Sequence, residues 1–194
     1  MSYILDIFLG QGGNAKVYKA YTLNTPNFEA VAIKVIKKNV RGSSGYFFDY
    51  SRVLEEANIW KELDHPCIAK FHEAITTADA TYFVIEYAEG GELFDFVLED
   101  FKKDTSSESV AKVQFFQILS GVAHVHSQGF VHRDLKLENI LLKTHSKTGL
   151  IKIADFGLSR QATNSMCSFV GTPQYTAPGR DSMVYTLYIG ACYS

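Results

Sequence analysis

The sequence predicts an α+β protein in which a strand-rich first half precedes a helix-rich second half. Short β-prone runs separated by glycine and polar turns fill most of residues 3–87. Longer amphipathic stretches follow from residue 92 onward. Hydrophobic residues make up 46% of the 194-residue chain and charged residues 21%. These proportions are ordinary for a globular protein, and the length allows a sizeable core.

Composition and charge exclude several functional classes. The net charge of −2 implies no broad positive field, so we expect no nucleic-acid binding by bulk charge. The three cysteines lie far apart and suggest neither a disulfide framework nor a zinc site. The N-terminus lacks the layout of a signal peptide, and no apolar run is long enough to span a bilayer. We therefore expect a cytoplasmic or nuclear protein that contacts no membrane.

The first half predicts five strands and one helix. The expected strands are residues 3–9, 17–21, 30–36, 67–75 and 81–87. The expected helix covers residues 48–63. Val53, Ala57 and Trp60 recur on it at i, i+4 and i+7 and form one apolar face. Pro66 lies just beyond its end and stops it.

The second half predicts two helices. Residues 92–101 form a short amphipathic stretch. Thr105 with Glu108 three residues later predicts a capping box, which opens a long helix that ends near Gly129. The remaining expected segments are short and apolar: residues 139–142 and 150–153.

A glycine-rich turn joins the first two expected strands, with the sequence Gly10-Gln11-Gly12-Gly13-Asn14-Ala15-Lys16-Val17. Gly10 and Gly12 let the backbone come close to a phosphate. A strand on each side argues against a dinucleotide fold or a P-loop, since both place a helix after the loop. A simple hairpin is the alternative, and the turn alone does not decide between the two.

Lys34 ends the apolar strand and has two interpretations. It is either an edge lysine that protects the sheet from aggregation, or a lysine held over phosphate oxygens by a carboxylate of the next helix. Glu55 and Glu56 both lie on that helix. Counting back from the stop at Pro66 favours Glu56 as the partner and leaves Glu55 as a solvated charge.

The most informative segment is His132-Arg133-Asp134-Leu135-Lys136-Leu137-Glu138-Asn139, which is followed by Asp155-Phe156-Gly157. Oxygen ligands from Asn139 and Asp155 suit magnesium ions that bridge phosphates. Asp134 can accept a proton from a hydroxyl. A solvated loop of charges is the alternative, and the occurrence of all these motifs in this order argues against it.

These motifs resemble the signature of the protein kinase family, and the chain is similar to a eukaryotic serine/threonine protein kinase domain over residues 3–178. Residues 86–95 and the catalytic loop resemble the calcium/calmodulin-dependent and checkpoint-kinase branch. Lys136, two residues after Asp134, resembles the Ser/Thr class. The resemblance implies a two-lobe fold, with a complete small β-rich lobe at about residues 3–87 and an incomplete helical large lobe at about 88–178.

The resemblance also implies ATP and Mg²⁺ as cofactors and a role for each residue of the site. Asp134 would orient the substrate hydroxyl and accept its proton. Lys136 would neutralise charge on the transferred phosphoryl group. Lys34, paired with Glu56, would hold the α- and β-phosphates. The magnesium ligands would be Asn139 and Asp155.

The nucleotide would lie between the lobes. The residues expected to surround it are Leu9, Gly10, Gly12, Val17, Ala32, Lys34, Glu86, Ala88 and Leu141. Backbone groups of Glu86 and Ala88 would bind the adenine edge, with Ile85 as the gatekeeper behind it. A hydrophobic column joining the lobes would contain Trp60, Phe71, His132 and Phe156.

The expected partner is a protein substrate with Ser or Thr as the target. Glu92 and Glu138 match positions where Arg-directed kinases place acids, so we expect arginine upstream of the target. Exposed surface charges are the alternative. Arg133 beside the catalytic aspartate could receive a phosphate, and Ser168 is the expected site of an upstream activating kinase.

The family pattern breaks at the end of the activation segment. The expected Ala-Pro-Glu reads Ala177-Pro178-Gly179, and residues 179–194 resemble nothing in the family, so we expect an unrelated tail. An incomplete large lobe should expose part of the apolar face of the long helix. The candidates for exposure are Phe115, Ile118, Leu119 and Val122. The alternatives to an active kinase are a catalytically silent fragment that binds nucleotide or a partner, and a chain that does not fold alone.

Overall fold

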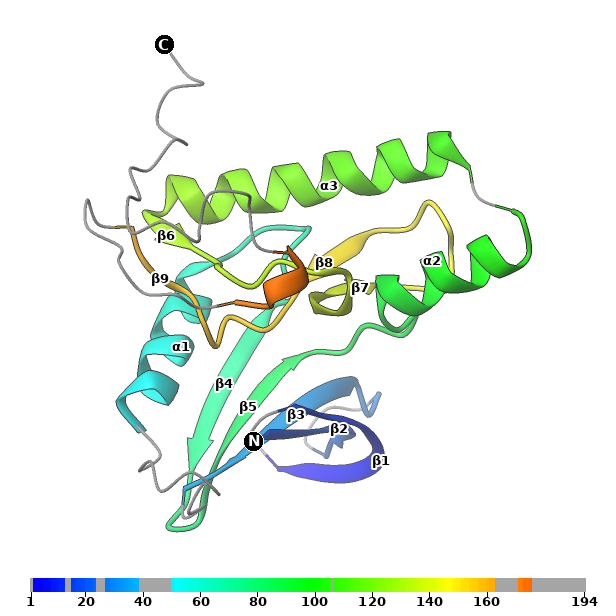
Figure 1. The fold of residues 1–194 in the computed structure, drawn as a ribbon. Coiled ribbons are helices and arrows are strands. Elements are labelled where there is room, and N and C mark those ends of the chain that lie inside the picture. Colours follow the sequence, from blue (N-terminus) through cyan, green and yellow to red (C-terminus); the bar gives the residue numbers. More distant parts are fainter. Residues whose placement is uncertain are drawn as a thin grey trace.

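The computed structural model of the chain describes residues 2–12, 15–23, 27–38, 50–105, 107–162 and 171–175 (Figure 1). A five-stranded sheet lies at one end of this part, and the long helix lies at the other. Along the chain, the five strands of the sheet precede the two helices at Leu93–Lys102 and Glu108–Ser127, which confirms the predicted α+β order. No helix within the described ranges is long and apolar enough to cross a membrane.

The small lobe is built on one antiparallel sheet with the strand order β1-β2-β3-β5-β4. Its strands are β1 (Tyr3–Gly12), β2 (Ala15–Thr22), β3 (Ala30–Lys37), β4 (Phe71–Thr76) and β5 (Ala80–Glu86). β1 continues past its expected end into the glycine-rich turn, because Gly10 and Gly12 pair with Val17 and Ala15. β4 begins only at Phe71, so the expected strand at residues 67–75 is four residues shorter at its start.

The helix α1 (Tyr50–Glu62) lies beside β4, the edge strand of the sheet (Figure 1). Val53, Ile59 and Trp60 are buried there, and so is the carboxylate-bearing Glu56. The Trp60 indole Nε1 donates a hydrogen bond of 2.7 Å to the Ala69 carbonyl. The expected start of the helix at residues 48–49 lies outside the described residues.

The large lobe contributes α2 (Leu93–Lys102), α3 (Glu108–Ser127) and two short strand pairs. β6 (Phe130–Val131) pairs with β9 (Arg160–Gln161), and β7 (Ile140–Leu142) pairs with β8 (Ile151–Ile153). The large lobe also contains two single 3₁₀ turns, Leu137–Asn139 and Pro173–Tyr175. The sequence analysis expects no strand at either β6 or β9, so it does not predict their pairing.

The predicted capping box at Thr105 and Glu108 is wrong. α3 begins at Glu108 with Ser107 as its N-cap residue, and the Ser107 side chain makes no capping bond. The Thr105 hydroxyl instead donates to Asp100 Oδ1 at 2.9 Å, so it closes the end of α2. The predicted end of α3 is confirmed, because Gly129 follows it with φ +77°, a conformation that glycine adopts without strain.

The apolar face of α3 is only partly covered by the described chain. Phe115 and Leu119 are exposed, as expected, whereas Ile118 and Val122 pack against the core. Gly121 allows α3 to lie close to β8, since a Cβ there would come within 2.7 Å of the Ile153 side chain. The core therefore holds one edge of α3 and leaves its outer edge uncovered.

A column of aromatic rings passes from the sheet into the large lobe. Ring centroids lie 5.5 Å apart for Phe83 and Phe71, 5.9 Å for Phe71 and Trp60, and 5.1 Å for Trp60 and Phe156. His132 completes the column at 4.8 Å from Phe156. The stacking predicted from the sequence is confirmed, with Phe83 as an additional member. The column makes the two lobes share one core.

Replacing Trp60 with alanine tests the importance of this column. Removing a buried Trp costs about 3–5 kcal/mol, a large share of the roughly 5–15 kcal/mol that stabilises a whole domain. Trp60 is 1% exposed, so we expect Trp60→Ala to lower the free energy of unfolding by about 3–5 kcal/mol, measured by urea denaturation.

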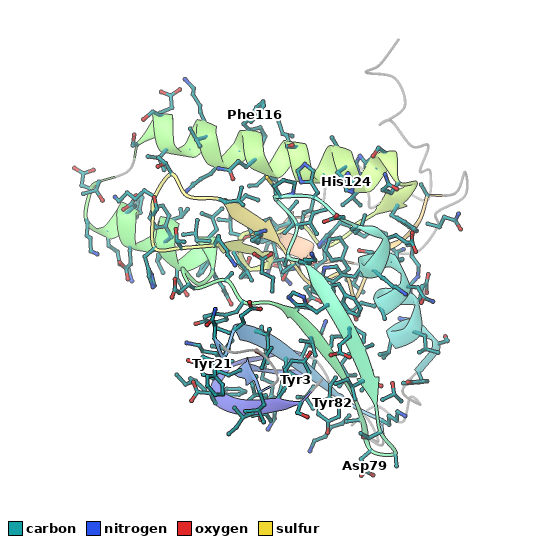
Figure 2. All side chains as sticks on the ribbon, turned by 180° about the vertical axis from the view of Figure 1, so that it is seen from behind. Tyr3, Tyr21, Asp79, Tyr82, Phe116 and His124 are labelled. Carbon is teal, nitrogen blue, oxygen red and sulfur yellow. The ribbon has the colours of Figure 1, made fainter. Side chains whose placement is uncertain are left out.

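Phe116→Ala is the matched control, because Phe116 lies on the outer side of α3 and is 74% exposed (Figure 2). Its free energy of unfolding should change by less than about 0.5 kcal/mol. Equal losses in the two variants would contradict a core that is centred on Trp60.

Candidate active site

Lys34 brings together three separate parts of the chain. Strand β3 carries it, and its Nζ lies 2.7 Å from Glu56 Oε1 on α1 and 2.8 Å from Asp155 Oδ1 after β8. Glu56 is 5% exposed, so this carboxylate depends on the lysine for charge compensation. The partner of Lys34 on α1 is Glu56, the glutamate that the helix count favours.

The lysine keeps its charge in this setting. Burial alone would lower the pKa of Lys34, but the carboxylates of Glu56 and Asp155 outweigh it and raise the pKa above its ordinary value. An ammonium cation is thus fixed between two acidic groups. A cation in this position can also attract the oxygens of a phosphate.

Glu55 is not the freely solvated charge that the sequence suggests. Its Oε1 lies 3.3 Å from Arg160 Nε, and the two side chains are 41% and 22% exposed. Arg160 belongs to β9, a strand that the sequence prediction lacks. The neighbouring glutamates of α1 therefore have different partners: Glu56 pairs with Lys34 of the small lobe and Glu55 with Arg160 of the large lobe.

Asp134 lies at the centre of a second polar group. Lys136 Nζ is 2.9 Å from Asp134 Oδ2, and the Thr172 hydroxyl donates to Asp134 Oδ1 at 2.6 Å. The Asn139 amide donates to the Asp134 carbonyl at 2.8 Å and to its Oδ2 at 3.2 Å. Lys136 also donates to the Thr172 hydroxyl oxygen at 3.1 Å. The carboxylate is thereby held in one orientation.

His132 fixes the backbone of this loop. Its Nδ1 accepts the Asp134 amide at 3.3 Å, so its Nε2 carries the proton that binds the Ala154 carbonyl at 3.0 Å. The Ala154 amide in turn donates to the Asn139 carbonyl at 2.9 Å. These two bonds of Ala154 therefore hold the loop at residues 132–139 next to Asp155.

Two non-glycine residues at the site adopt the left-handed backbone conformation. Arg133 has φ 69° and Asp155 has φ 59°. Such conformations cost free energy and persist where surrounding contacts require them, often at functional sites. Arg133 Nε donates to the Leu158 carbonyl at 2.7 Å, which supplies one such contact.

The side chains expected around the adenine form part of the shared core. Ala32 and Ile85 are buried opposite one another on β3 and β5. Val17 and Leu141 pack against the same cluster and are partly exposed. Leu9 lies outside the cluster and is 44% exposed, so the structure brings four of these five side chains together.

Gly10 and Gly12 are not required by packing within the described chain. A Cβ at either position would meet no described atom within 4 Å. Packing among the described residues therefore does not explain why these two positions are glycine.

The segment that follows β5 is attached directly to β7. The Gly90 amide donates to the Leu142 carbonyl, and the Leu142 amide donates to the Gly91 carbonyl, both at 2.9 Å. A Cβ on Gly90 would lie 2.3 Å from the Thr144 carbonyl oxygen, so only glycine fits without a backbone shift. Glu86 and Ala88, the residues expected to bind the adenine edge, lie just before this attachment.

Sequence reasoning misses two contacts of the site. It does not place Thr172 on the Asp134 carboxylate, and it does not connect Arg160 with Glu55. Three predicted features lie outside the described residues: Ser168, the Ala177-Pro178-Gly179 motif and the tail at 179–194.

Comparison with known proteins identifies the family. Residues 3–181 match the family described as "Protein kinase domain". The chain is 36% identical over 182 residues to the ovarian-specific serine/threonine-protein kinase Lok of Drosophila melanogaster, covering 91% of this chain and 37% of the relative. It is 38% identical over 181 residues to CBL-interacting serine/threonine-protein kinase 20 of Arabidopsis thaliana, covering 91% and 38%.

A third relative is the maternal embryonic leucine zipper kinase of Xenopus tropicalis, 38% identical over 180 residues, with 91% of this chain and 26% of the relative covered. The chain thus spans between about a quarter and two-fifths of the length of these curated relatives.

The neutral, buried His132 predicts a pH dependence of stability. Burial lowers its pKa below the ordinary value, although the bond to Ala154 and the carboxylates of Asp155 and Asp134 act in the opposite direction. The unfolded chain therefore takes up this proton first as the pH falls. The contribution of neutral His132 to the free energy of unfolding is therefore complete above the pKa of the unfolded chain, about 6.5. This contribution is lost as the pH falls below that value.

We expect the free energy of unfolding to fall between pH 6.5 and 5. His132→Gln should reduce that slope by up to about 1.4 kcal/mol per pH unit, measured by urea denaturation across this range. His145→Gln is the control, because His145 is exposed on the β7–β8 turn, and its slope should match the parent. A parental slope in His132→Gln would show that His132 does not stay neutral in the fold.

Proposed function

Because the chain belongs to the protein kinase domain family, we propose that it transfers the terminal phosphate of ATP to Ser or Thr in protein substrates. The observation that carries this proposal is the way in which Asp134 and Lys136 hold the Thr172 hydroxyl. Asp134 accepts a hydrogen bond from this hydroxyl at 2.6 Å, and Lys136 donates one to its oxygen at 3.1 Å. A substrate hydroxyl would need the same two partners during transfer.

Asp134 is suited to orient the hydroxyl rather than to act as a strong base. Burial acts to raise the pKa of Asp134, but its bonds from Thr172 and Lys136 outweigh burial and lower the pKa. The carboxylate is therefore ionised at neutral pH and aligns the attacking oxygen. It would receive the proton as the new O–P bond forms and the bond between the γ-phosphorus and the bridging oxygen of ADP breaks, while Lys136 offsets charge on the phosphoryl oxygens.

Mg²⁺ fits the donor chemistry of Asn139 and Asp155. Asn139 uses its amide N–H on Asp134, which leaves its side-chain carbonyl oxygen as a ligand. Asp155 adds a carboxylate, and oxygen ligands are those that Mg²⁺ prefers. When bound, the metal would neutralise phosphate charge. No group of three or more His, Cys, Asp or Glu side chains among the described residues could hold a metal.

The nucleotide would occupy the space between the glycine-rich turn and β7. Lys34 would hold the α- and β-phosphates, and the amides around Gly10 and Gly12 would approach them. Val17 and Ala32 would cover the adenine from above, and Leu141 from below. These side chains share one apolar cluster, which supports a flat apolar ligand at this position.

A substrate with arginine upstream of the target fits the acidic residues beside the catalytic loop. The pKa of Glu92 is raised by partial burial and then by the carboxylates of Asp95 and Glu138, so these three acids lie close together. Carboxylates bind the planar fork of arginine better than the ammonium of lysine. The Tyr175 hydroxyl donates to Glu138 at 3.2 Å, which links this group to the activation segment.

Ser168 is the proposed site of an upstream activating kinase. The support is Arg133, a fixed cation beside Asp134 whose Nε binds the Leu158 carbonyl at the start of the activation segment. A phosphate on Ser168 would form charge-assisted bonds with an arginine in this position.

Replacing Asp134 with asparagine tests the proposed catalysis. Loss of a positioned base lowers turnover by roughly 10²–10⁴-fold, while nucleotide affinity should change little because Asp134 faces the hydroxyl. The measurements are phosphate transfer to a basic peptide and a thermal shift with Mg-ATP. Asp79→Asn, in the exposed turn between β4 and β5, is the control and should keep full activity (Figure 2).

The same two assays separate the alternatives. Equal transfer by the parent and Asp134→Asn would show that the transfer comes from a contaminant. A thermal shift without transfer in the parent would favour a silent nucleotide-binding fragment, and the absence of both would contradict the proposed function.

Peptide variants test the proposed substrate class. Replacing the upstream arginine with lysine should raise the KM of the peptide. In Glu92→Gln, the ratio of the KM values for the lysine and arginine peptides should be about two- to fivefold smaller than in the parent. This factor is the range of an exposed ion pair. Glu99→Gln is the control on the same helix, since Glu99 pairs with Lys103 and lies outside the acidic group. A peptide array without upstream arginine enrichment would contradict this preference.

A further inference from the structure

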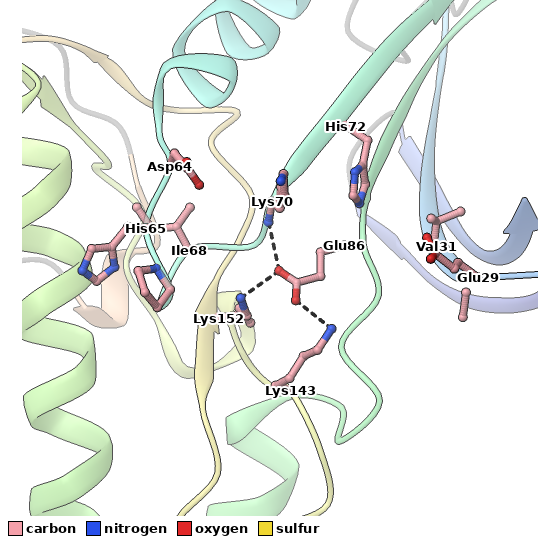
Figure 3. Close-up of a pocket in the computed structure, with 12 residues that line it drawn as sticks. Glu29, Val31, Asp64, His65, Ile68, Lys70, His72, Glu86, Lys143 and Lys152 are labelled. Atoms are coloured by element: carbon pink, nitrogen blue, oxygen red, sulfur yellow. Dashed lines mark hydrogen bonds and ion pairs between the residues drawn. The ribbon is translucent and has the colours of Figure 1, made fainter. Parts of the chain in front are cut away.

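The side chain of Glu86 gathers donors from three separate segments (Figure 3). Its Oε1 lies 2.7 Å from Lys143 Nζ, just after β7. Its Oε2 lies 2.8 Å from Lys152 Nζ on β8 and accepts the Lys70 backbone amide at 3.1 Å, just before β4. One carboxylate at the end of β5 thus joins the small lobe to Lys152 of β8 and to Lys143 just after β7. We call Glu86, Lys143 and Lys152 the hinge clasp.

The clasp consists of charged groups with limited access to water. The Lys152 side chain is 8% exposed and that of Glu86 is 17% exposed, while Lys143 is 40% exposed. Burial acts to raise the pKa of Glu86, but the bonds from Lys143 and Lys152 outweigh it and lower the pKa. The carboxylate is therefore ionised. Losing it would leave the buried Lys152 without this partner, which is costly.

Lys143 contacts the segment after β5 at further points. Its Nζ donates to the Tyr87 carbonyl at 3.3 Å, and its own carbonyl accepts the Glu89 amide at 3.1 Å. Together with the bonds of Gly90 to β7, these contacts hold the backbone on both sides of Ala88. The segment that would bind adenine is fixed before any ligand arrives.

The clasp lies on the side of this segment that faces away from the proposed nucleotide site. Glu86, Lys143 and Lys152 line a hollow of about 700 Å³. Of the residues proposed to surround the nucleotide, only Glu86 lines this hollow. The clasp therefore acts on the nucleotide through the backbone of residues 86–88 and not by contact.

We propose that the hinge clasp is a positioning device for adenine, which fixes the backbone of residues 86–88 in the conformation that binds the adenine edge. The proposal rests on the proposed nucleotide site. A backbone that is already ordered does not lose conformational freedom on binding, so affinity is higher. Because the effect concerns adenine alone, it should be equal for adenosine and for Mg-ATP.

The test is the affinity of the full chain for adenosine and for Mg-ATP, measured by calorimetric titration. Lys143→Gln removes the most exposed member of the clasp and keeps the Glu86–Lys152 pair. We expect both dissociation constants to rise by the same factor, about three- to tenfold. Lys143→Arg should restore the parental values, because its charge can reach Glu86.

Lys147→Gln is the matched control. Lys147 lies in the same β7–β8 connection, is 49% exposed and pairs with Asp100 at 2.7 Å, away from Glu86. Its dissociation constants should equal those of the parent. Equal weakening in Lys147→Gln and Lys143→Gln would overturn the proposal, because it would show a general effect of loosening this connection.

Glu86→Gln is the second variant, and it decides the question if Lys143→Gln does not fold. It keeps the shape of the side chain and should weaken both ligands at least as much. Because the two changes share the Glu86–Lys143 ion pair, the double variant should weaken binding by less than the product of the two single losses. Thermal unfolding separates stability from positioning: a lower melting temperature with parental dissociation constants would overturn the proposal.

The failure of the clasp is distinguishable from the failure of the proposed function. A parent chain that binds neither adenosine nor Mg-ATP overturns both. A parent that binds them and variants that bind equally well overturn the clasp alone.

Discussion

The ammonium group of Lys34 is the point on which the arrangement of the molecule depends. Strand β3, helix α1 and the loop after β8 each bring one charged group to this point. A buried carboxylate such as Glu56 is tolerated only with a cation beside it, and the cation is shared with Asp155. The requirement to balance charge thus sets where α1 lies against the sheet and where the chain after β8 passes.

The aromatic column supports this polar point from the apolar side. Phe156 is the residue after Asp155, and its ring lies between Trp60 of α1 and His132 of the loop at residues 132–139. The same short segment thus carries a carboxylate to Lys34 and a ring into the core. Polar and apolar interactions therefore specify one position for it, which is the consistency expected of a well-defined site.

Local sequence signals predict much of this fold. Alternating apolar runs give the strands of the sheet, and the stop at Pro66 gives the register of α1, from which Glu56 follows as the partner of Lys34. The roles of Lys34 and Asp134 in catalysis stay predictions. Thr105 is mistaken for a cap because its hydroxyl has two possible partners, and tertiary structure gives it to Asp100. The two-residue strands β6 and β9 carry no local signal, since their pairing depends on distant residues. The hinge clasp is unpredictable for the same reason.

Gly90 determines how closely the segment after β5 approaches β7. A side chain there would meet the backbone oxygen of Thr144, which cannot rotate away as a flexible side chain can. Any other amino acid would force the segment after β5 away from β7, and Leu141 would move with the strand that carries it. The distance between the segment after β5, which would bind the adenine edge, and Leu141, which would lie below the adenine, therefore depends on the absence of a Cβ at Gly90. Specificity for the thickness and reach of a flat ring can thus be encoded by the absence of a side chain.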